Sequence, residues 1–225
     1  MGEHRTISEL VPVFPLPEVV LFPRQLLPLH IFEPRYRAMT ADALAGEGCI
    51  AISLLKDGFE RTYFTPHAPI HSIVGVGQVV ASEKLEDGRY NILLRGLCRA
   101  RILEELPGKP YRRARLTLLP PVCHASAAHR RALRQELRRA IARNLCQDGD
   151  LREQLLTLCR APLKLAELTD LVACHLPVPA ELRQCVLEEL DAVSRAQVVV
   201  EQLNTLGAVA RRTRRVELQD AWTFN

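Results

Sequence analysis

The sequence predicts a protein of the α+β class, in which a mostly antiparallel sheet or barrel with one helix precedes a helical bundle. Early in the chain, apolar and polar side chains alternate with the period of half-buried strands. Prolines and glycines separate these short runs, as turns require. From Ala125 onward the apolar residues recur every three or four positions, which is the helical period. We therefore predict a sheet domain over residues 1–122 and a helical domain over residues 123–225.

Prolines punctuate the first apolar segment, which covers residues 11–34 and reads VPVFPLPEVVLFPRQLLPLHIFEP. Because proline has no N–H to donate to a sheet, this segment predicts short edge strands and turns rather than a central strand. Pro34 can open a helix, which Gly46 and Gly48 would end. One face of that helix would then carry Tyr36, Met39, Ala43 and Leu44.

Three further strands follow from apolar runs. The continuous run from Cys49 to Leu55 predicts a buried strand that ends at the turn Lys56-Asp57-Gly58, with residues 59–65 returning alongside it. Residues 70–81 are rich in valine and predict a second strand. Residues 112–119 alternate arginines with apolar residues, which predicts a third before Pro120 and Pro121 end the region.

The longest strand is expected in the stretch DGRYNILLRGLCRARILEEL, residues 87–106. Its apolar and polar residues alternate, and Gly96 interrupts the run as a bulge or bend would. We therefore predict one long, bent strand that forms a hairpin with the strand before it. In this pattern Cys98 packs inward as a small apolar residue instead of acting as an activated thiol. The arginines of the opposite face are Arg95, Arg99 and Arg101, which we expect to form a solvated sheet face, with a contact surface as the alternative.

The second half of the chain predicts five helices. Asp148 or Asp150 can cap the second helix, and Pro162 and Pro179 can open the third and fourth. The apolar positions that define the five are Leu133, Leu137, Ile141 and Leu145; Leu151, Leu155 and Leu158; Leu165, Leu168 and Val172; Leu182, Val186 and Leu190; and Val193, Ala196, Val200 and Leu203. The basic cluster at residues 211–215 and the tail after it lack such a pattern, so we expect this end to fray.

Composition narrows the class of protein. The chain has 225 residues, 48% of them hydrophobic, with a net charge of +4 that does not make nucleic acid the expected partner. Seven cysteines without a CxxC pair argue against a disulfide framework and a zinc ribbon, and the Cys-His neighbours lack ligand spacing. We predict neither a metal nor another cofactor. Without a secretory signal or a membrane-length apolar run, a cytoplasmic protein is expected.

Two segments carry a resemblance to a known family. Residues 11–36, VPVFPLPEVVLFPRQLLPLHIFEPRY, resemble the opening of the N-terminal substrate-binding domain of Lon-type ATP-dependent proteases. Residues 75–102, GVGQVVASEKLEDGRYNILLRGLCRARI, resemble its central hairpin, including a Gly-Leu-x-Arg-Ala-Arg signature. Residues 168–179, LTDLVACHLPVP, are similar to the family's helical part, though less specifically. The resemblance implies a PUA-like barrel followed by a helical bundle.

The role implied by this resemblance is recognition of unfolded or damaged protein before an ATPase and a protease act on it. The sequence itself has no GxxxxGK[ST] phosphate loop, and its one Gly-Lys pair, Gly108-Lys109, is followed by Pro110. None of the serines lies in a segment that resembles the Lon peptidase domain. We therefore predict a free-standing recognition module without catalytic activity. Its expected partners are unfolded or regulatory client proteins, or an ATP-dependent protease.

The predicted protein-binding surface lies in the proline-punctuated segment and at the start of its helix. It comprises Phe22, Leu27, Phe32, Arg35 and Tyr36. Apolar groups presented by loops on a rigid sheet can adapt to many client sequences. The same side chains can instead fill the mouth of the barrel, so we expect only some of the set to be exposed.

A second function remains open, because PUA-like domains also occur in RNA-binding proteins. The arginine-rich surface of the first bundle helix, together with the cluster at residues 211–215, would contact phosphates. An aromatic content of 5%, without interleaved basic and aromatic residues, argues against base stacking.

Overall fold

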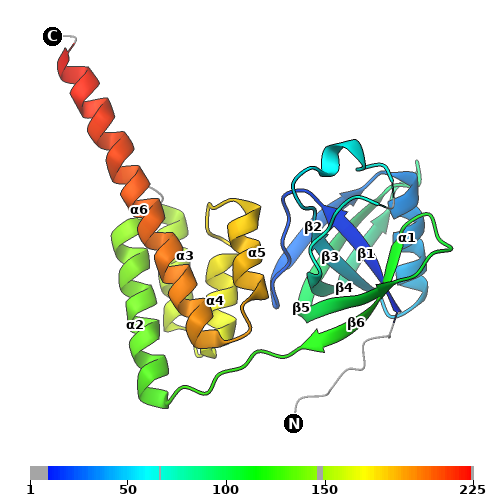
Figure 1. The fold of residues 1–225 in the computed structure, drawn as a ribbon, viewed down its shortest axis with the longest axis horizontal. Coiled ribbons are helices and arrows are strands. Elements are labelled where there is room, and N and C mark those ends of the chain that lie inside the picture. Colours follow the sequence, from blue (N-terminus) through cyan, green and yellow to red (C-terminus); the bar gives the residue numbers. More distant parts are fainter. Residues whose placement is uncertain (1–9, 66, 146–148, 224–225) are drawn as a thin grey trace. The chain divides into compact units, whose positions relative to one another are not determined.

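The computed structural model describes residues 10–65, 67–145 and 149–223, with side chains up to residue 213 (Figure 1). Contacts divide the chain into two compact units. The sheet unit comprises Met1–Pro120 with Arg183–Glu188, and the helical unit comprises Pro121–Leu182 with Glu189–Asn225. In the part of the chain that is described, no helix combines the length and apolar character needed to cross a bilayer. Division into independently folding domains at residues 122 and 123 stays a prediction.

The sheet unit is built on a six-stranded sheet with the order β2-β5-β4-β3-β1-β6, in which β5 also pairs with β6. All pairs are antiparallel except β1 with β3. The strands are β1 (Leu10–Leu16), β2 (Leu26–Ile31), β3 (Cys49–Leu54), β4 (Ile73–Lys84), β5 (Tyr90–Glu105) and β6 (Arg112–Leu119). This sheet and the helices that follow it confirm the predicted fold class.

The position of β1 corrects the prediction that prolines confine the first segment to edge strands. β1 lies between β3 and β6, although it contains Pro12 and Pro15. Residues 10–13 pair with β6 and residues 13–16 pair with β3. Each half therefore has one side without a neighbouring strand, where a missing N–H removes no ladder hydrogen bond. The edge prediction is correct for β2, which contains Pro28 and pairs with β5.

β5 is the long, bent strand that the alternation predicts. Its pairing with β4 shifts register so that Val76 faces Cys98 while Gly77 faces Gly96, which leaves Leu97 as the extra residue of a bulge. The predicted solvated face is wrong at Arg99, which is only 2% exposed. Its guanidinium Nε donates to the Leu187 carbonyl at 2.8 Å, and the group lies 5.9 Å from the Phe22 ring centroid. Residues from elsewhere in the sheet unit thus cover this part of β5.

The connection between β1 and β2 crosses β4 and β5 at close range, and glycines make this possible. A Cβ atom at Gly75 would lie 1.9 Å from the Leu21 carbonyl oxygen, and one at Gly96 would lie 2.0 Å from the Phe22 carbonyl oxygen. Gly96 also accepts a hydrogen bond from Arg24 N and donates one to Gln25 O. The crossing backbone therefore leaves no room for a side chain at either position.

Helix α1 (Pro34–Ala45) begins at the predicted proline and packs Tyr36 and Met39 against the sheet (Figure 1). The rings of Tyr36 and Phe14 lie 4.3 Å apart between centroids. Leu44, placed on the buried face by the sequence, is 39% exposed. The return strand predicted for residues 59–65 is also wrong, because this segment begins with the 3-10 helix η1 (Phe59–Arg61).

Part of helix α5 (Ala180–Glu188) belongs to the sheet unit and is held there by polar contacts. Gln184 Nε2 donates to the Ile73 carbonyl at 2.9 Å, and Arg183 Nη2 donates to the Glu18 carbonyl at 2.9 Å. These bonds add to the bond that Arg99 makes with the Leu187 carbonyl. The segment 183–188 therefore completes a unit whose other residues precede it by more than 60 positions.

The five helices predicted for the second half of the chain are confirmed. Besides α5 they are α2 (Ala127–Asn144), α3 (Gly149–Arg160), α4 (Leu165–Ala173) and α6 (Ala192–Thr223), and α6 packs against α2 and α4. Helix α6 continues through residues 211–215 to Thr223, although the sequence there lacks an amphipathic pattern, and fraying of this end stays a prediction. The proposed cap Asp148 lies outside the described residues. The Ser126 hydroxyl caps α2 by accepting a hydrogen bond from His129 N at 3.2 Å.

Asp191 caps the first turn of α6 and gives a pH-dependent prediction. Its Oδ1 accepts hydrogen bonds from Val193 N at 3.0 Å and Ser194 N at 2.9 Å. The bond from Ser194 is the main cause that lowers the carboxyl pKa below its usual value. We expect Asp191→Ala to lower the free energy of unfolding by about 1 kcal/mol at pH 7 in urea denaturation.

A lowered pKa stabilises the fold above the unfolded-state value of about 3.9, and that contribution disappears as the pH falls through the folded-state value. The difference between the wild-type protein and Asp191→Ala should therefore shrink below about pH 4. Asp191→Asn, which retains an acceptor oxygen, should keep most of the stability at pH 7. An equal loss for Ala and Asn, or a loss independent of pH, would contradict the capping role.

Candidate protein-binding surface

The structure separates the five residues predicted to bind protein into two groups. Phe22 is 0% exposed and Tyr36 is 3% exposed, so both belong to the core and have no surface to offer a client. Leu27 is partly buried against the core. Phe32 is 60% exposed, and the Arg35 side chain retains 18% exposure. The binding role of the set stays a prediction, now centred on Phe32.

A polar network fixes the segment that carries Phe32. Arg35 Nε forms an ion pair with Glu33 Oε2 at 2.9 Å, and its Nη2 donates to the Tyr63 carbonyl at 3.1 Å. The Tyr63 hydroxyl donates to Glu33 Oε1 at 3.2 Å. The Arg35 guanidinium also lies over the rings of Tyr36 and Tyr63, at 4.4 and 5.3 Å from their centroids. The network joins the start of α1 to the segment that follows η1.

Aromatic rings gather around this network, on two segments. Phe64 is 83% exposed and lies edge-on to the Tyr63 ring, with the centroids 5.0 Å apart. The Phe59 ring lies 6.0 Å from that of Tyr63. On the other segment, Phe32 stacks on His30 at 6.3 Å. We call Phe32, Tyr63 and Phe64 the aromatic surface.

The electrostatics of the network keep the Tyr63 phenol protonated. Burial raises the pKa of Tyr63, and the neighbouring Glu33 carboxylate raises it further. Burial is also the main cause that raises the pKa of Tyr36. Tyr63 therefore stays a hydrogen-bond donor to Glu33 across the ordinary pH range.

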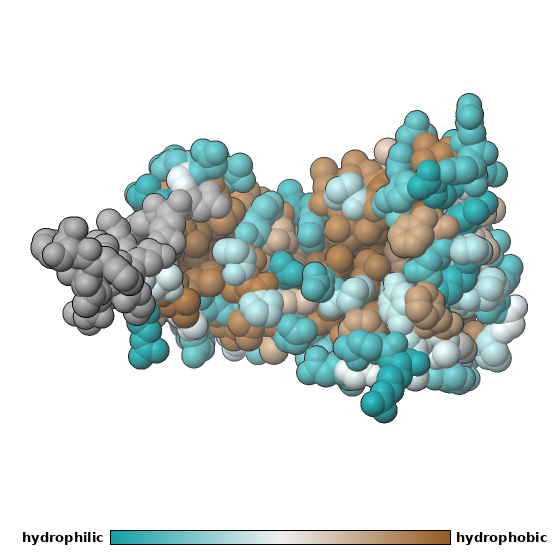
Figure 2. Space-filling view, turned by 90° about the horizontal axis from the view of Figure 1, so that it is seen from above, coloured by the Kyte–Doolittle hydropathy of each residue, from teal (hydrophilic) through white to brown (hydrophobic). Residues whose placement is uncertain are grey.

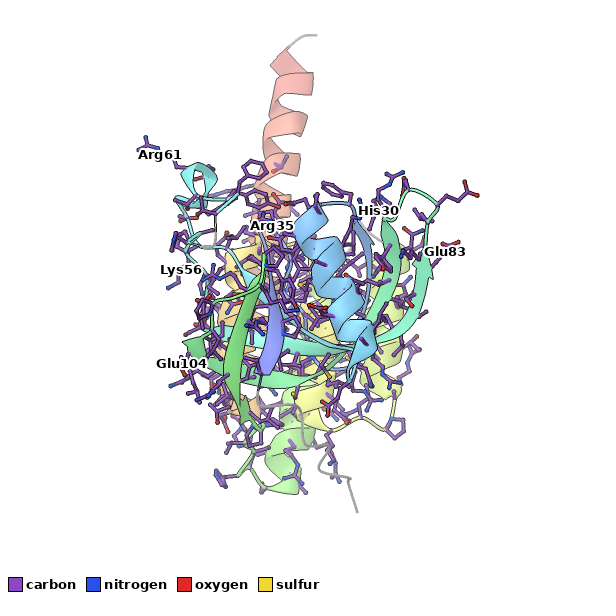
Figure 3. All side chains as sticks on the ribbon, turned by 90° about the vertical axis from the view of Figure 1, so that its right-hand side faces the viewer. His30, Arg35, Lys56, Arg61, Glu83 and Glu104 are labelled. Atoms are coloured by element: carbon purple, nitrogen blue, oxygen red, sulfur yellow. The ribbon has the colours of Figure 1, made fainter. Side chains whose placement is uncertain are left out.

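The figures show how this end of the sheet unit is arranged. In Figure 3, Arg35 lies at the upper end of α1, with the loop that carries Arg61 on one side and His30 on the other. Figure 2 shows apolar groups exposed among hydrophilic ones on the sheet unit, at the right of the view. Apolar groups that are exposed on a rigid base are a common feature of protein-binding sites.

Sequence reasoning missed Tyr63 and Phe64, because residues 59–65 were interpreted as a strand. The segment FERTYF holds three aromatic residues within six positions, which is a signal in a chain with an aromatic content of 5%. Its aromatic residues do not alternate with period two, since Tyr63 and Phe64 are neighbours. This lack of alternation is evidence in the sequence against a strand.

The described residues of the sheet unit give little support to nucleophilic or metal-dependent chemistry. Burial raises the pKa of the Cys98 thiol to about 11, so it is not an activated nucleophile. Among the residues with described positions, no three His, Cys, Asp or Glu side chains gather as metal ligands would.

Comparison with known families shows which family the chain belongs to. Residues 10–205 match the ATP-dependent protease La (LON) substrate-binding domain. The chain belongs to this Lon substrate-binding domain family. The match confirms the resemblance seen in residues 11–36 and 75–102.

Relatives of this Lon substrate-binding domain are Lon proteases. Lon protease 2 of Myxococcus xanthus is 24% identical over 211 residues, which cover 94% of this chain and 25% of that protein. The Lon protease of Trichlorobacter lovleyi is 28% identical over 194 residues, which cover 86% of this chain and 23% of that protein. The chain thus spans about a quarter of the length of the curated relatives it matches.

Solved structures of Lon N-terminal domains have the same fold. The N-terminal domain of the Mycobacterium avium complex Lon protease aligns with a TM-score of 0.68 at 18% identity, covering 87% of this chain and 98% of that one. A Lon N-terminal domain protein from Xanthomonas campestris aligns with a TM-score of 0.61 at 19% identity, covering 85% and 97%.

In this Lon substrate-binding domain the signature at residues 96–101 has a packing role. Gly96 lies under the crossing backbone, Arg99 is buried, and Ala100 is 0% exposed within the core cluster that also contains Val74 and Val76. The signature therefore maintains the sheet, while the aromatic surface lies at the start of α1 and beside η1.

Proposed function

We propose that this Lon substrate-binding domain recognises exposed apolar segments of unfolded or damaged proteins for an ATP-dependent protease, and that it catalyses no reaction itself. The aromatic surface would supply the contact. The observation that carries the proposal is the exposure of Phe32 and Phe64, at 60% and 83%, on two segments joined by the network of Glu33, Arg35 and Tyr63. Exposed rings on a rigid base lose little conformational freedom on binding.

The alternative of RNA binding through α2 has weaker support. Arg134, one of the arginines of that helix, donates from Nη1 to the carbonyl oxygens of Cys159 and Ala161 at 3.2 and 2.8 Å. Its guanidinium is thus already used in packing α2 against the last turn of α3 and the residue that follows it. Membership of a substrate-binding family also favours a polypeptide as the partner.

Replacing Phe32 and Phe64 together by serine should weaken capture of a denatured, fluorescently labelled model protein by about tenfold or more, measured by fluorescence anisotropy. The reason is that burial of the two rings would supply much of the apolar contact. Because both side chains are exposed, the fold should be retained, with the free energy of unfolding changed by about 0.5 kcal/mol or less.

Leu103→Ser is the matched control, because Leu103 is 63% exposed but lies on β5 next to Glu104, which Figure 3 places at the opposite end of the unit. This variant should bind the denatured protein as the wild-type chain does. Unchanged capture by the folded double variant would reject the aromatic surface as the site. Loss of capture on addition of RNA, with RNA bound more tightly than denatured protein, would favour the alternative function.

A further inference from the structure

A hollow of about 320 Å³ opens in the sheet unit between the first turns of α1 and the hairpin turn that joins β4 to β5. Its lining residues are Pro34, Arg37, Ala38, Lys84, Gly88 and Tyr90. Two of these side chains are cationic and none is acidic. The first turn of a helix adds a partial positive charge, which also favours an anion.

The Arg37 guanidinium lies against the turn at Gly88. Gly88 has a φ of 78°, and a Cβ atom there would lie 2.2 Å from Arg37 Nη2. Hydrogen bonds from Leu85 N to Arg89 O and from Gly88 N to Leu85 O close the turn. Glycine at position 88 thus serves the turn and also leaves the space that the guanidinium occupies.

Two of the nearby carboxylates, those of Asp87 and Glu83, accept hydrogen bonds from residues that do not line the hollow. Asp87 accepts hydrogen bonds from Arg89 N at 3.0 Å and from Arg89 Nε at 2.6 Å, and Glu83 accepts one from Asn91 Nδ2 at 3.0 Å. Arg89 is the main cause that lowers the pKa of Asp87, and Arg37 contributes less. Within the described chain, neither Arg37 nor Lys84 forms an ion pair. Lys84 lies over the Tyr90 ring, 5.8 Å from its centroid.

The hollow adjoins the aromatic surface. Pro34 lines the hollow and follows Phe32 by two residues, so the two features meet at the start of α1. Tyr90 and Lys84 pair in one row with Ile31 and lie on the sheet face opposite to His30, on which Phe32 stacks. A bound peptide that runs from Phe32 past Pro34 into the hollow would cover about 10 Å, which takes about three extended residues.

The geometry points to an oxyanion site that reads an acidic group about three residues from the apolar anchor of a bound polypeptide. Arg37 would bind the oxyanion with its planar fork, and Lys84 would add the second positive charge. Such a site would make clients with mixed apolar and acidic segments bind more tightly than purely apolar ones. This inference rests on the proposed function, since the aromatic surface supplies the anchor.

Three fluorescein-labelled, unstructured peptides test the site with the full chain. Each carries a Leu-Phe pair, flanked at three residues on either side by Glu in the first peptide, Gln in the second and phosphoserine in the third. For the wild-type protein at low salt, we expect the Glu peptide to bind about fivefold more tightly than the Gln peptide. In Arg37→Gln and in Lys84→Gln, the ratio of the affinity for the Glu peptide to that for the Gln peptide should fall towards one. The affinity for the Gln peptide should stay unchanged.

Arg61→Gln is the matched control, since Arg61 is exposed on η1, away from the hollow, and its loss should leave the Glu preference intact (Figure 3). Tighter binding of the phosphoserine peptide than of the Glu peptide would support the site and assign its oxyanion to phosphate. Equal binding of the Glu and Gln peptides would overturn the site but leave the proposed function standing. Failure of all three to bind would overturn both.

Discussion

Replacing Asp170 by alanine should destabilise the helical unit by about 3–5 kcal/mol, a large part of the stability of an ordinary domain. Asp170 is 3% exposed and Arg195 is 0% exposed, and Arg195 Nε lies 3.1 Å from Asp170 Oδ1. The same Nε donates to the Thr169 hydroxyl at 3.2 Å, while Nη1 donates to the Glu189 carbonyl at 2.6 Å. Removal of the carboxylate would leave a buried guanidinium without its counter-charge.

Urea denaturation followed by circular dichroism measures this loss. Glu136→Ala, which removes an exposed carboxylate from α2, is the control and should change the free energy of unfolding by about 0.5 kcal/mol or less. The double variant Asp170→Leu with Arg195→Met should recover most of the stability, because it removes the charges together and fills the space with apolar groups. A loss below about 1 kcal/mol in Asp170→Ala would show that water reaches the arginine.

A methyl group at residue 96 is the second change with a large expected effect. In Gly96→Ala the added Cβ would lie 2.0 Å from the Phe22 carbonyl oxygen and 3.3 Å from Pro23 Cα. Both are backbone atoms, which cannot move aside as the end of a flexible side chain can. We expect the sheet unit to lose about 3 kcal/mol, because the crossing segment must separate from β5 and give up its two hydrogen bonds to Gly96.

Gly46→Ala provides the comparison, since a Cβ there meets only the carbonyl oxygens of Ala43 and Asp42 at 3.7 Å. Its cost should be small in the same denaturation experiment. Amide hydrogen exchange adds a local measurement, because Arg24 N donates to Gly96 O and should lose protection in Gly96→Ala. Full protection at Arg24 in the variant would mean that the crossing segment accommodates the methyl group.

Periodicity predicted most of the fold because it records which side of each element is buried. Gly96 and Pro34 themselves predicted the bulge of β5 and the start of α1, because local backbone chemistry decides both. Periodicity failed where tertiary contacts decide. Arg99 is buried because residues 183–188 and Phe22 cover it, and neither neighbour can be inferred from the alternation of β5.

The candidate surface was harder to predict, for the same reason. Phe22, Phe32 and Tyr36 are equally apolar in sequence, yet only Phe32 is exposed. Exposure depends on where the β1–β2 connection crosses the sheet and on which face of α1 meets it. Tyr63 lies beside Arg35 because the chain after η1 returns to the start of α1, a tertiary contact between residues 28 positions apart in sequence.

The return of residues 183–188 to the sheet unit has a practical consequence for dissecting this protein. No single cut yields the sheet unit intact, since truncation after Pro120 discards the Leu187 carbonyl that receives Arg99 and the Gln184 amide that binds Ile73. Such a fragment would expose the Arg99 guanidinium and the Ile73 carbonyl, which residues 183–188 cover in the longer chain. A chimera between this domain and a Lon relative should therefore exchange the chain through Glu188 as one piece, or graft the aromatic surface alone.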